Sequence, residues 1–380
     1  MSFRIPFNKP FIVGKELYYI AQSVLQLQTS GDGVYTKKSQ QLMKDTFGAQ
    51  DILLTTSCTA ALDLAAILSD VKEGEEVILP SFTFSSTANA FLLRGARLVF
   101  VDCRRDTMNI DETLLEAAIS EKTRIIVPVH YAGVACEMDT IAALAKKYRL
   151  TVIEDAAQGV NAKYKNRYLG TIGDIGTYSF HETKNFTCGE GGALLINDPA
   201  YIERAEVIRE KGTNRNRFFR GQVDKYTWVD IGSSFLPSDL LAAFLYGQLE
   251  ARERIQARRR EIWTYYYDCL HNWVHENDVR LPIIPVDCEQ TYHMFYLLLP
   301  SLERRQSFIS HLKANGIYSV FHYLPLHLSE MGQRLGGKHG QCPVTEDLSD
   351  RLVRLPFYYA LTPDDQMKVV QAVYQYQIDP

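Results

Sequence analysis

Short apolar runs alternate with stretches of helical periodicity between about residue 50 and residue 196. The runs ILLTT, EVILP, RLVFVD, RIIVPVHY, TVIED, GTYSF and ALLIN are rich in β-branched and other apolar residues, which predicts a seven-stranded sheet. Between most of them lie patterns that are apolar at helical spacing, such as TAALDLAAILSD, ETLLEAAIS and MDTIAALAKKY. This alternation is typical of an α/β domain in which a mainly parallel sheet is buried between helices.

The pattern changes after one long helical stretch, SDLLAAFLYGQLEARERIQARRREIWTYYYDCL, whose polar face is strongly charged. The rest of the chain predicts a strand at HMFYLLLP, a helix that ends at glycine in RRQSFISHLKANG, a strand at IYSVFHYLP and two terminal helices. We therefore expect a large domain over residues 1–250 and a smaller α+β domain over residues 251–380. Two positions remain open for the first thirty or so residues, on the small domain or on a partner subunit.

Composition narrows the class of ligand. The 41 basic and 45 acidic residues give a formal charge of -4 without a long run of one sign, which disfavours nucleic acid and anionic membranes. Seven scattered cysteines show no Cys-x-x-Cys pair and no zinc spacing with the histidines, so we expect a reduced, cytoplasmic protein without a metal site. No apolar run has the length of a membrane span or of a signal peptide.

Three places that follow predicted strands carry polar residues, and ligands of open α/β sheets bind at such strand ends. In LLTTSCTAALDLAA a helix begins at Ser57, Cys58 and Thr59, where free N–H groups and two hydroxyls suit a phosphate. An ordinary capped helix is the alternative. In TVIEDAAQGV the strand ends at Asp155, which is either a helix cap or a partner for a protonated ring nitrogen.

The third place is SFHETKNFTCGEGG, where Ser179 and Lys184 lie at or beyond the end of strand GTYSF. Taken together, the three places supply a phosphate cradle, an anion for a ring nitrogen and an amine able to form a Schiff base. Pyridoxal phosphate needs these groups from a protein. Phe84, which follows strand EVILP, could stack on the cofactor ring or pack in the core.

The chain resembles the DegT-type sugar-nucleotide aminotransferases, a branch of the fold-type I pyridoxal phosphate enzymes. The resemblance runs nearly end to end through SCTAAL, PSFTFSSTANA, FVDCRRDTMNIDE, VPVHYAG, IEDAAQG, SFHETKN with GEGG, FHYLPLH and PVTEDLSDRLVRLPFY. Within the family, REKGTNRNRFFRGQVDKYTWVDIGSS and VPVHYAGVACEMDTI are similar to the members that make dTDP-4-amino-4,6-dideoxygalactose for enterobacterial common antigen.

The resemblance implies roles for the matching positions. Lys184 would bind pyridoxal phosphate covalently, Asp155 would pair with its ring nitrogen and Gln158 would lie near its phenolic oxygen. Phe84 would stack on the ring. The phosphate would be held by Ser57, Cys58, Thr59 and Ser179.

The chain departs from the family pattern in two stretches: the first concerns the expected homodimer with shared active sites, and the second concerns the close approach of the backbone to the phosphate. The family has Gly-x-Asn-x-Arg where this chain has GSSFL, so Ser234 replaces an asparagine that reaches the other subunit's phosphate and Leu236 replaces the arginine. Cys58 stands where glycine is common. Serine can still donate a hydrogen bond to phosphate.

By the same resemblance, the reaction moves an amino group from L-glutamate to carbon 4 of a dTDP-linked 4-keto-6-deoxyhexose, through pyridoxamine phosphate. A 3-keto sugar aminotransferase and a non-catalytic binding protein remain as alternatives. Related sugar dehydratases carry histidine in place of the lysine, so Lys184 favours transfer. His181 is either catalytic or structural. Cations and aromatic rings suit a nucleotide sugar, and the candidates are Arg215, Lys225, Tyr226, His322, Tyr323 and His327.

Overall fold

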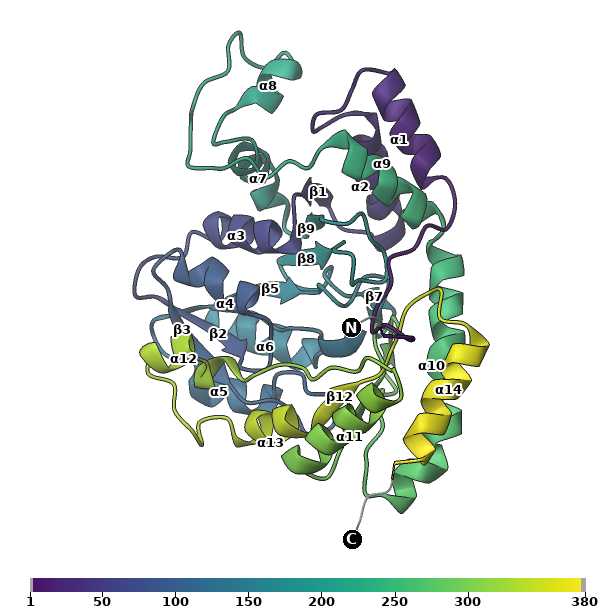
Figure 1. The fold of residues 1–380 in the computed structure, drawn as a ribbon. Coiled ribbons are helices and arrows are strands. Elements are labelled where there is room, and N and C mark those ends of the chain that lie inside the picture. Colours follow the sequence, from purple (N-terminus) through teal and green to yellow (C-terminus); the bar gives the residue numbers. More distant parts are fainter. Residues whose placement is uncertain (1–2, 377–380) are drawn as a thin grey trace.

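The computed structural model describes residues 3–376, and within that range the large domain is built on a seven-stranded sheet (Figure 1). Six strands are parallel, and β9 is antiparallel to both of its neighbours. The predicted α/β fold with a mainly parallel sheet is confirmed. In spatial order the strands are β1 (Asp51–Thr55), β9 (Gly192–Ile196), β8 (Ile175–Ser179), β5 (Thr151–Asp155), β4 (Thr123–Ile126), β2 (Glu76–Pro80) and β3 (Arg97–Val101).

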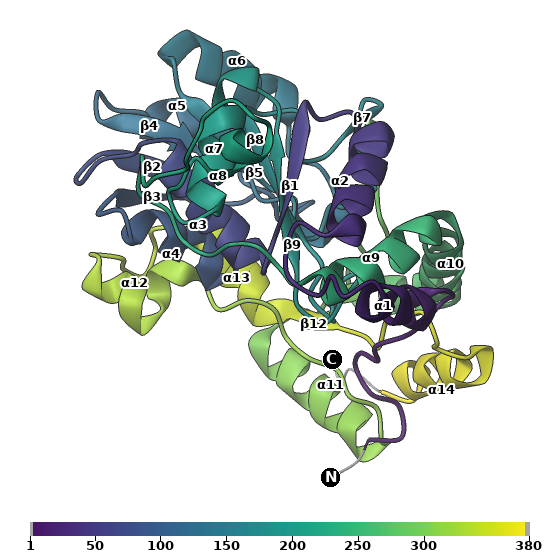
Figure 2. The same ribbon diagram turned by 90° about the horizontal axis from the view of Figure 1, so that it is seen from above.

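Helices bury both faces of this sheet, which explains why its strands read as continuous apolar runs. Ile52 and Leu54 belong to one core and Leu53 to the other, as the alternation of side chains along a strand requires. Figure 2 shows α2 and α3 on opposite sides of β1. One core includes α2 (Val34–Phe47), α6 (Met138–Tyr148) and α9 (Asp239–Glu250); the other includes α3 (Cys58–Leu68), α4 (Ser85–Leu92) and α7 (Ile202–Arg209).

The C-terminal part has its own core, in which Tyr266, Phe295, Leu312 and Val373 are fully buried. Its elements are α10 (Arg252–Glu276), β11 (Tyr296–Leu298), α11 (Leu302–Ala314), α12 (Glu330–Arg334), α13 (Pro343–Arg351), β12 (Leu352–Arg354) and α14 (Pro363–Tyr374). Helices α10 and α14 lie side by side (Figure 1). A small sheet of β6 (Lys163–Tyr164), β7 (Arg167–Tyr168) and β10 (Cys288–Glu289) joins this part to the large domain.

Two predicted elements differ from the structure. The long helical stretch is divided into α9 and α10 at Ala251, whose ψ angle of 9° departs from helical geometry. The break lets α9 pack on the large domain while α10 enters the core of the small one. IYSVFHYLP forms no regular strand; it makes isolated bridges from Ile317 to Ile5 and from Val320 to Arg354, and most of it lines a cavity.

The N-terminal residues contact both parts of the molecule. Ile5 is buried and pairs with Ile317 of the small domain. Helix α1 (Glu16–Leu25) instead packs on α9, where the buried Glu16 carboxylate accepts hydrogen bonds from Gly14 N and Gln248 Nε2. Two shorter helices are α5 (Leu115–Ala118) and α8 (Arg215–Phe219), and α8 with its flanking loops stands out at the top of Figure 1.

Candidate active site

A cavity of about 780 Å³ opens at the carboxyl ends of β5 and β8, beside the first turns of α3 and α4. Its other wall comes from the small domain, through residues 318, 320–324 and 354. The cavity therefore lies between two domains, a usual position for small-molecule sites. Its volume falls within the range of roughly 300–1,000 Å³ that is common for such pockets.

The start of α3 is held close to strand β9. The hydroxyl of Ser57 caps the helix by accepting a hydrogen bond from Ala60 N (3.0 Å). A Cβ atom on Gly192 would lie 2.4 Å from Cys58 N, so only glycine lets the two backbones approach this closely. Burial raises the pKa of the Cys58 thiol and keeps it neutral. The capped-helix interpretation is thus true of Ser57, and the same turn also lines the cavity.

The start of α4 lies against that of α3. Thr59 Oγ1 and Ser86 Oγ are 2.8 Å apart, so the two helix starts present neighbouring hydroxyls. Phe84 precedes α4 with 58% of its surface exposed, and its ring lines the cavity instead of packing in the core. Its centre is 6.2 Å from that of Tyr323. An open aromatic face and a group of hydroxyls therefore lie in the same cavity.

Asp155 ends β5 and is 5% exposed. Its Oδ2 atom accepts a hydrogen bond from Thr87 Oγ1 (2.7 Å), and Oδ1 accepts one from Ala157 N (3.1 Å). Donors to both oxygens hold the carboxylate in one orientation. Asp155 is thus a fixed, buried carboxylate at the edge of the cavity.

Lys184 lies in the loop between β8 and β9 and is half-buried in the cavity wall. Burial lowers the pKa of its amine, helped by the charge of Arg354, while Cys58 and Asp155 act in the opposite direction. Among the described residues the amine has no ion-pair partner; its backbone N donates to His181 O (2.9 Å). A lysine with a lowered pKa and no carboxylate partner is suited to nucleophilic and proton-transfer chemistry.

Gln158 and two residues of the small domain close the cavity. Gln158 accepts a hydrogen bond from Ala132 N (2.7 Å) and donates one to Tyr323 OH (3.1 Å). The His322 ring stacks on Tyr323 at 3.5 Å, and its Nδ1 atom is 3.0 Å from Tyr131 OH. Burial lowers the pKa of His322 well below its usual value. Two of the six candidates for substrate contact, His322 and Tyr323, thus line this cavity, and Tyr323 contacts Gln158 directly.

Other residues predicted for the site lie elsewhere. Ser234, Arg215, Lys225 and Tyr226 are exposed and do not line the cavity of their own chain. They belong to the segment around α8, where Arg215 pairs with Glu210 (3.1 Å).

The prediction that His327 contacts the substrate is corrected by the structure, because this residue does not line the cavity. Its ring is fully buried, with Nδ1 2.6 Å from Ser81 Oγ and Nε2 2.9 Å from Glu346 Oε1. Both nitrogens are therefore engaged in joining the end of β2 to the small domain. By contrast, Ser179 and His181 do line the cavity, and His181 Nδ1 lies 2.9 Å from Thr183 Oγ1.

Three lining or supporting residues were missed in the sequence. Thr87 holds Asp155, and Arg354 brings a second cation to the cavity from β12. Asn185 follows Lys184 and donates from Nδ2 to Thr291 O (2.6 Å). No local pattern marks them, because each acts on residues distant in the sequence; the HETKN stretch could have drawn attention to Asn185 alone.

The donor set fits pyridoxal phosphate. Hydroxyls and free N–H groups at two helix starts suit a dianionic phosphate, the buried anion Asp155 suits a protonated ring nitrogen, and Lys184 offers an amine for a Schiff base. Phe84 offers a face for the ring. Fold and site together define a pyridoxal phosphate-dependent enzyme.

Comparison with known proteins supports the assignment to pyridoxal phosphate-dependent enzymes. The pattern of the DegT/DnrJ/EryC1/StrS aminotransferase family matches residues 13–374, and the chain belongs to that family. It is 33% identical to the spore coat polysaccharide biosynthesis protein SpsC of Bacillus subtilis (strain 168), covering 97% of this chain and 96% of the relative. It is 30% identical to the GDP-perosamine synthase of Escherichia coli O157:H7, over 99% of each chain.

Solved structures share the fold. The PMP form of a putative sugar aminotransferase, Spr1654 from Streptococcus pneumoniae, superimposes with a TM-score of 0.91 at 25% identity, over 98% of each chain. DesV of S. venezuelae, solved in complex with a ketimine intermediate, gives 0.88 at 27% identity over 100% of each chain. The chain is thus a pyridoxal phosphate-dependent sugar aminotransferase.

The described residues show neither a metal site nor a membrane-spanning helix. Within residues 3–376, no group of three or more His, Cys, Asp or Glu side chains is arranged to hold a metal ion. The same range contains no helix long and apolar enough to cross a bilayer. The seven cysteines are all free thiols.

Proposed function

We propose that this enzyme transfers the amino group of L-glutamate to carbon 4 of a dTDP-linked 4-keto-6-deoxyglucose, giving the 4-amino-4,6-dideoxygalactose product. The observation that carries the proposal is the presence of Lys184 and Asp155 in one cavity. Lys184 has no ion-pair partner among residues 3–376, and Asp155 is held by two donors. The resemblance of the REKGTNRNRFF and VPVHYAG stretches supports the dTDP-linked substrate.

Bound pyridoxal phosphate supplies an electrophilic carbon and a ring that accepts electron density. The Nζ atom of Lys184 takes the proton from the α-carbon of the amino donor and, in the second half-reaction, delivers a proton to carbon 4 of the sugar. Because burial lowers its pKa, the amine is more readily neutral and able to accept a proton. Asp155 would hold the ring nitrogen of the bound cofactor in its protonated form.

Arg354 is suited to bind the amino donor. It lines the cavity from the small domain, and its guanidinium donates to Phe321 O (3.3 Å) and to no carboxylate of the described residues. An arginine fork without a carboxylate partner recognises a carboxylate in two-point fashion. We assign it to glutamate, and His322 and Tyr323 to the sugar.

A second copy of the chain would complete the site. Large apolar side chains are exposed at the end of α1 and before α9, including Leu25, Leu27, Trp228 and Val229, which are 53–90% exposed. Such side chains favour burial in an interface. In a C2 dimer, Ser234 of the partner subunit would reach the phosphate, and the segment around α8 would bring Arg215, Lys225 and Tyr226 to the nucleotide.

Incubation with L-glutamate and dTDP-4-keto-6-deoxyglucose, followed by NMR of the product, tests the proposal. We expect an axial amino group at carbon 4, the galacto configuration. Amination at carbon 3, a gluco product, or activity only with a GDP-linked keto sugar would each contradict the proposed substrate while leaving the aminotransferase class intact.

A further inference from the structure

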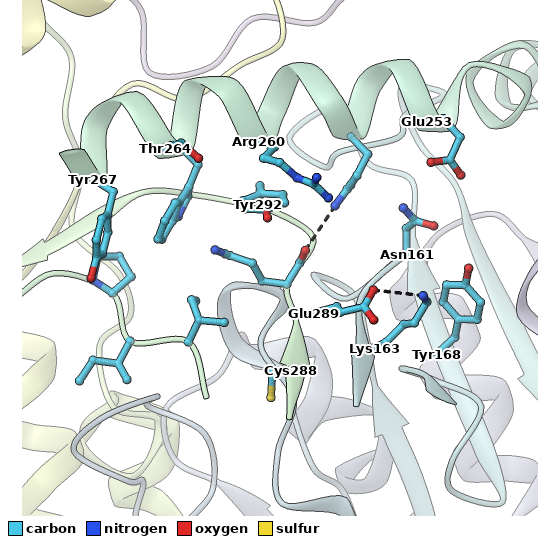
Figure 3. A pocket seen from close by; sticks show the side chains of 16 residues that line it. Asn161, Lys163, Tyr168, Glu253, Arg260, Thr264, Tyr267, Cys288, Glu289 and Tyr292 are labelled. Carbon is cyan, nitrogen blue, oxygen red and sulfur yellow. Dashed lines mark hydrogen bonds and ion pairs between the residues drawn. The ribbon is translucent and has the colours of Figure 1, made fainter. Parts of the chain in front are cut away.

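A second cavity, of about 710 Å³, lies between α10, the β6–β7 hairpin and the segment from 282 to 292 (Figure 3). None of the residues that line it lines the first cavity. The two cavities are nevertheless neighbours in the chain, since Gln290 and Tyr292 border the second while His293 and Met294 border the first. The proposed reaction makes no use of the second cavity.

The unneutralised charge in this cavity is positive. Lys163 pairs with Glu289 (3.1 Å), and Glu253 pairs with Arg252 (3.3 Å). Arg260 has no carboxylate partner among the described residues; its guanidinium lies 5.5 Å from the centre of the Tyr292 ring. Because both carboxylates are already paired, an anion is favoured over a cation or an amino acid.

Aromatic side chains form much of the wall of the second cavity. Trp263 and Tyr267 are stacked with ring centres 5.0 Å apart and an interplanar angle of 16°, and Tyr292 meets Trp263 edge to face. In Figure 3, Arg260 lies near Tyr292, between Tyr267 at one end of the cavity and Tyr168 at the other. Half-buried Tyr267 and Tyr292 leave part of each ring open to a planar ligand.

Trp263 adds an independent observation. Its side chain lines the cavity and the residue is only 8% exposed, yet its indole Nε1 has no acceptor in the part of the chain that the structure describes. A buried N–H without a partner is unfavourable in a folded protein. This N–H is itself inaccessible to solvent, so a ligand oxygen would reach it only after the indole shifts, whereas the exposed Arg260 guanidinium can donate directly.

The segment between the cavities is also tied to the catalytic lysine. Asn185, the neighbour of Lys184, donates from Nδ2 to both Thr291 O (2.6 Å) and Thr291 Oγ1 (2.9 Å), and its Oδ1 atom is 2.9 Å from His293 Nδ1. Tyr292 lies between Thr291 and His293 in the chain. Its φ angle is +52°, a left-handed conformation that non-glycine residues rarely adopt. Displacement of Tyr292 would therefore move Thr291 and His293, the two residues that hydrogen-bond to Asn185.

We propose that the second cavity binds a nucleoside phosphate, with its base against Tyr267 and Tyr292 and its phosphate on Arg260, and that its occupancy is transmitted through Thr291 and Asn185 to Lys184. The cavity volume accommodates such a ligand. The site is independent of which keto sugar the enzyme aminates. Binding of a nucleotide here would allow nucleotide-sugar levels to regulate cofactor capture or turnover.

Hydrogen–deuterium exchange of the pyridoxal phosphate-loaded enzyme, with and without dTMP, locates binding directly. We expect dTMP to slow exchange at least about twofold in peptides covering 253–267 and 282–292, and inorganic phosphate to have no such effect. Protection confined to 318–327 would place dTMP in the first cavity and overturn the proposal, as would no protection at all. Protection by phosphate alone would reduce the site to a simple anion site.

Matched variants on α10 identify the binding groups. Arg260→Ala should abolish the protection, and Arg260→Lys should weaken it because the fork is lost while the charge remains. Arg254→Ala is the control, since Arg254 lies on the same helix but donates to Val13 O outside the cavity. Retained protection in Arg260→Ala, or equal loss in Arg254→Ala, contradicts the assignment.

The link to Lys184 has its own test. Apoenzyme mixed with pyridoxal phosphate gains visible absorbance as Lys184 reacts, and saturating dTMP should change that rate at least about twofold in the wild type. Thr291→Val, which removes the hydroxyl that Asn185 contacts, should diminish the effect while dTMP still protects 253–267. An unchanged rate in the wild type rejects the coupling and leaves only a binding site. Failure of either experiment says nothing against the aminotransferase reaction, which is assayed separately.

Discussion

The hydroxyl of Thr87 donates to Oδ2 of Asp155 at 2.7 Å, and Thr87 is itself 1% exposed. The bond joins the first turn of α4 to the end of β5, two elements 68 residues apart in the sequence. The backbone N of Ala157 donates a hydrogen bond to the other carboxylate oxygen, Oδ1. Together they fix the orientation of the carboxylate assigned to the cofactor ring.

Thr87→Val should therefore lower kcat about tenfold, with the cofactor still bound, because one hydrogen bond to a buried carboxylate is lost. Steady-state kinetics with the visible spectrum measures both effects. Asp155→Asn should be more severe, and Asp155→Ala should leave only a trace of activity. Thr83→Val is the control: Thr83 Oγ1 lies 2.9 Å from Thr87 Oγ1 and does not touch Asp155. An equal loss in both threonine variants would refute the specific role of Thr87.

Lys184→Ala should reduce turnover by roughly 10³-fold or more, since the variant loses both the nucleophile and the proton-transfer group. Borohydride reduction followed by peptide mapping should find the cofactor on Lys184 in the wild type and on no peptide of the variant. Lys146→Ala, an exposed lysine of α6, serves as the control. A wild-type rate in Lys184→Ala would discard the assignment.

The pH dependence of Lys184 follows from its lowered pKa. In the apoenzyme the buried amine gives up its proton at a lower pH than the unfolded chain does, so the unfolded state binds more protons between the two pKa values. Stability should consequently rise with pH through that window, up to the ordinary lysine pKa of about 10.4. Lys184→Met, which has no proton to lose, should be the more stable apoenzyme near neutral pH. Thermal unfolding of both from pH 7 to pH 10 should show the difference shrinking, and a constant difference would contradict the lowered pKa.

Gly192→Ala should destabilise the protein by about 1–3 kcal/mol and weaken cofactor binding, because its Cβ would overlap the backbone of Ser57 and Cys58. Urea unfolding gives the free energy, and titration with pyridoxal phosphate gives the affinity. Gly189→Ala is the matched control in the same loop: no atom lies within 4 Å of its Cβ, and only its φ of +85° opposes a side chain. We expect Gly189→Ala to cost about 1 kcal/mol and to bind cofactor more tightly than Gly192→Ala.

Mixed dimers test the shared active site. Chains with Lys184→Ala and chains with Ser234→Asp should each be inactive alone, the second because an added anion repels the phosphate of the neighbouring site. Refolded together in equal amounts, half of the dimers would contain one intact site, so about a quarter of wild-type activity should return. Mixing wild type with Lys184→Ala calibrates subunit exchange. No recovery would argue against a contribution of Ser234 across subunits.

Much of the large domain could be predicted because its signals are local. Strands buried on both faces read as apolar runs, and residues at the carboxyl ends of parallel strands fall at one edge of the sheet. The sequence therefore predicts one site for Ser57, Asp155 and Ser179, and all three line the same cavity. The break between α9 and α10 at Ala251 could not be predicted, because the apolar spacing continues through it. The two helices are separated only because they pack on two different domains.

The sequence by itself determined the succession of strands, the lysine and the aspartate, because these depend on periodicity and on residues adjacent along the chain. Tertiary structure alone decided that Thr87 holds Asp155, that Arg354 enters the cavity and that His327 is withdrawn from it. It also placed Thr291 between two cavities, in contact with an asparagine 106 residues away. Such contacts join segments far apart in the chain, and the free energy that selects them comes from the packing of whole domains, which no local pattern records.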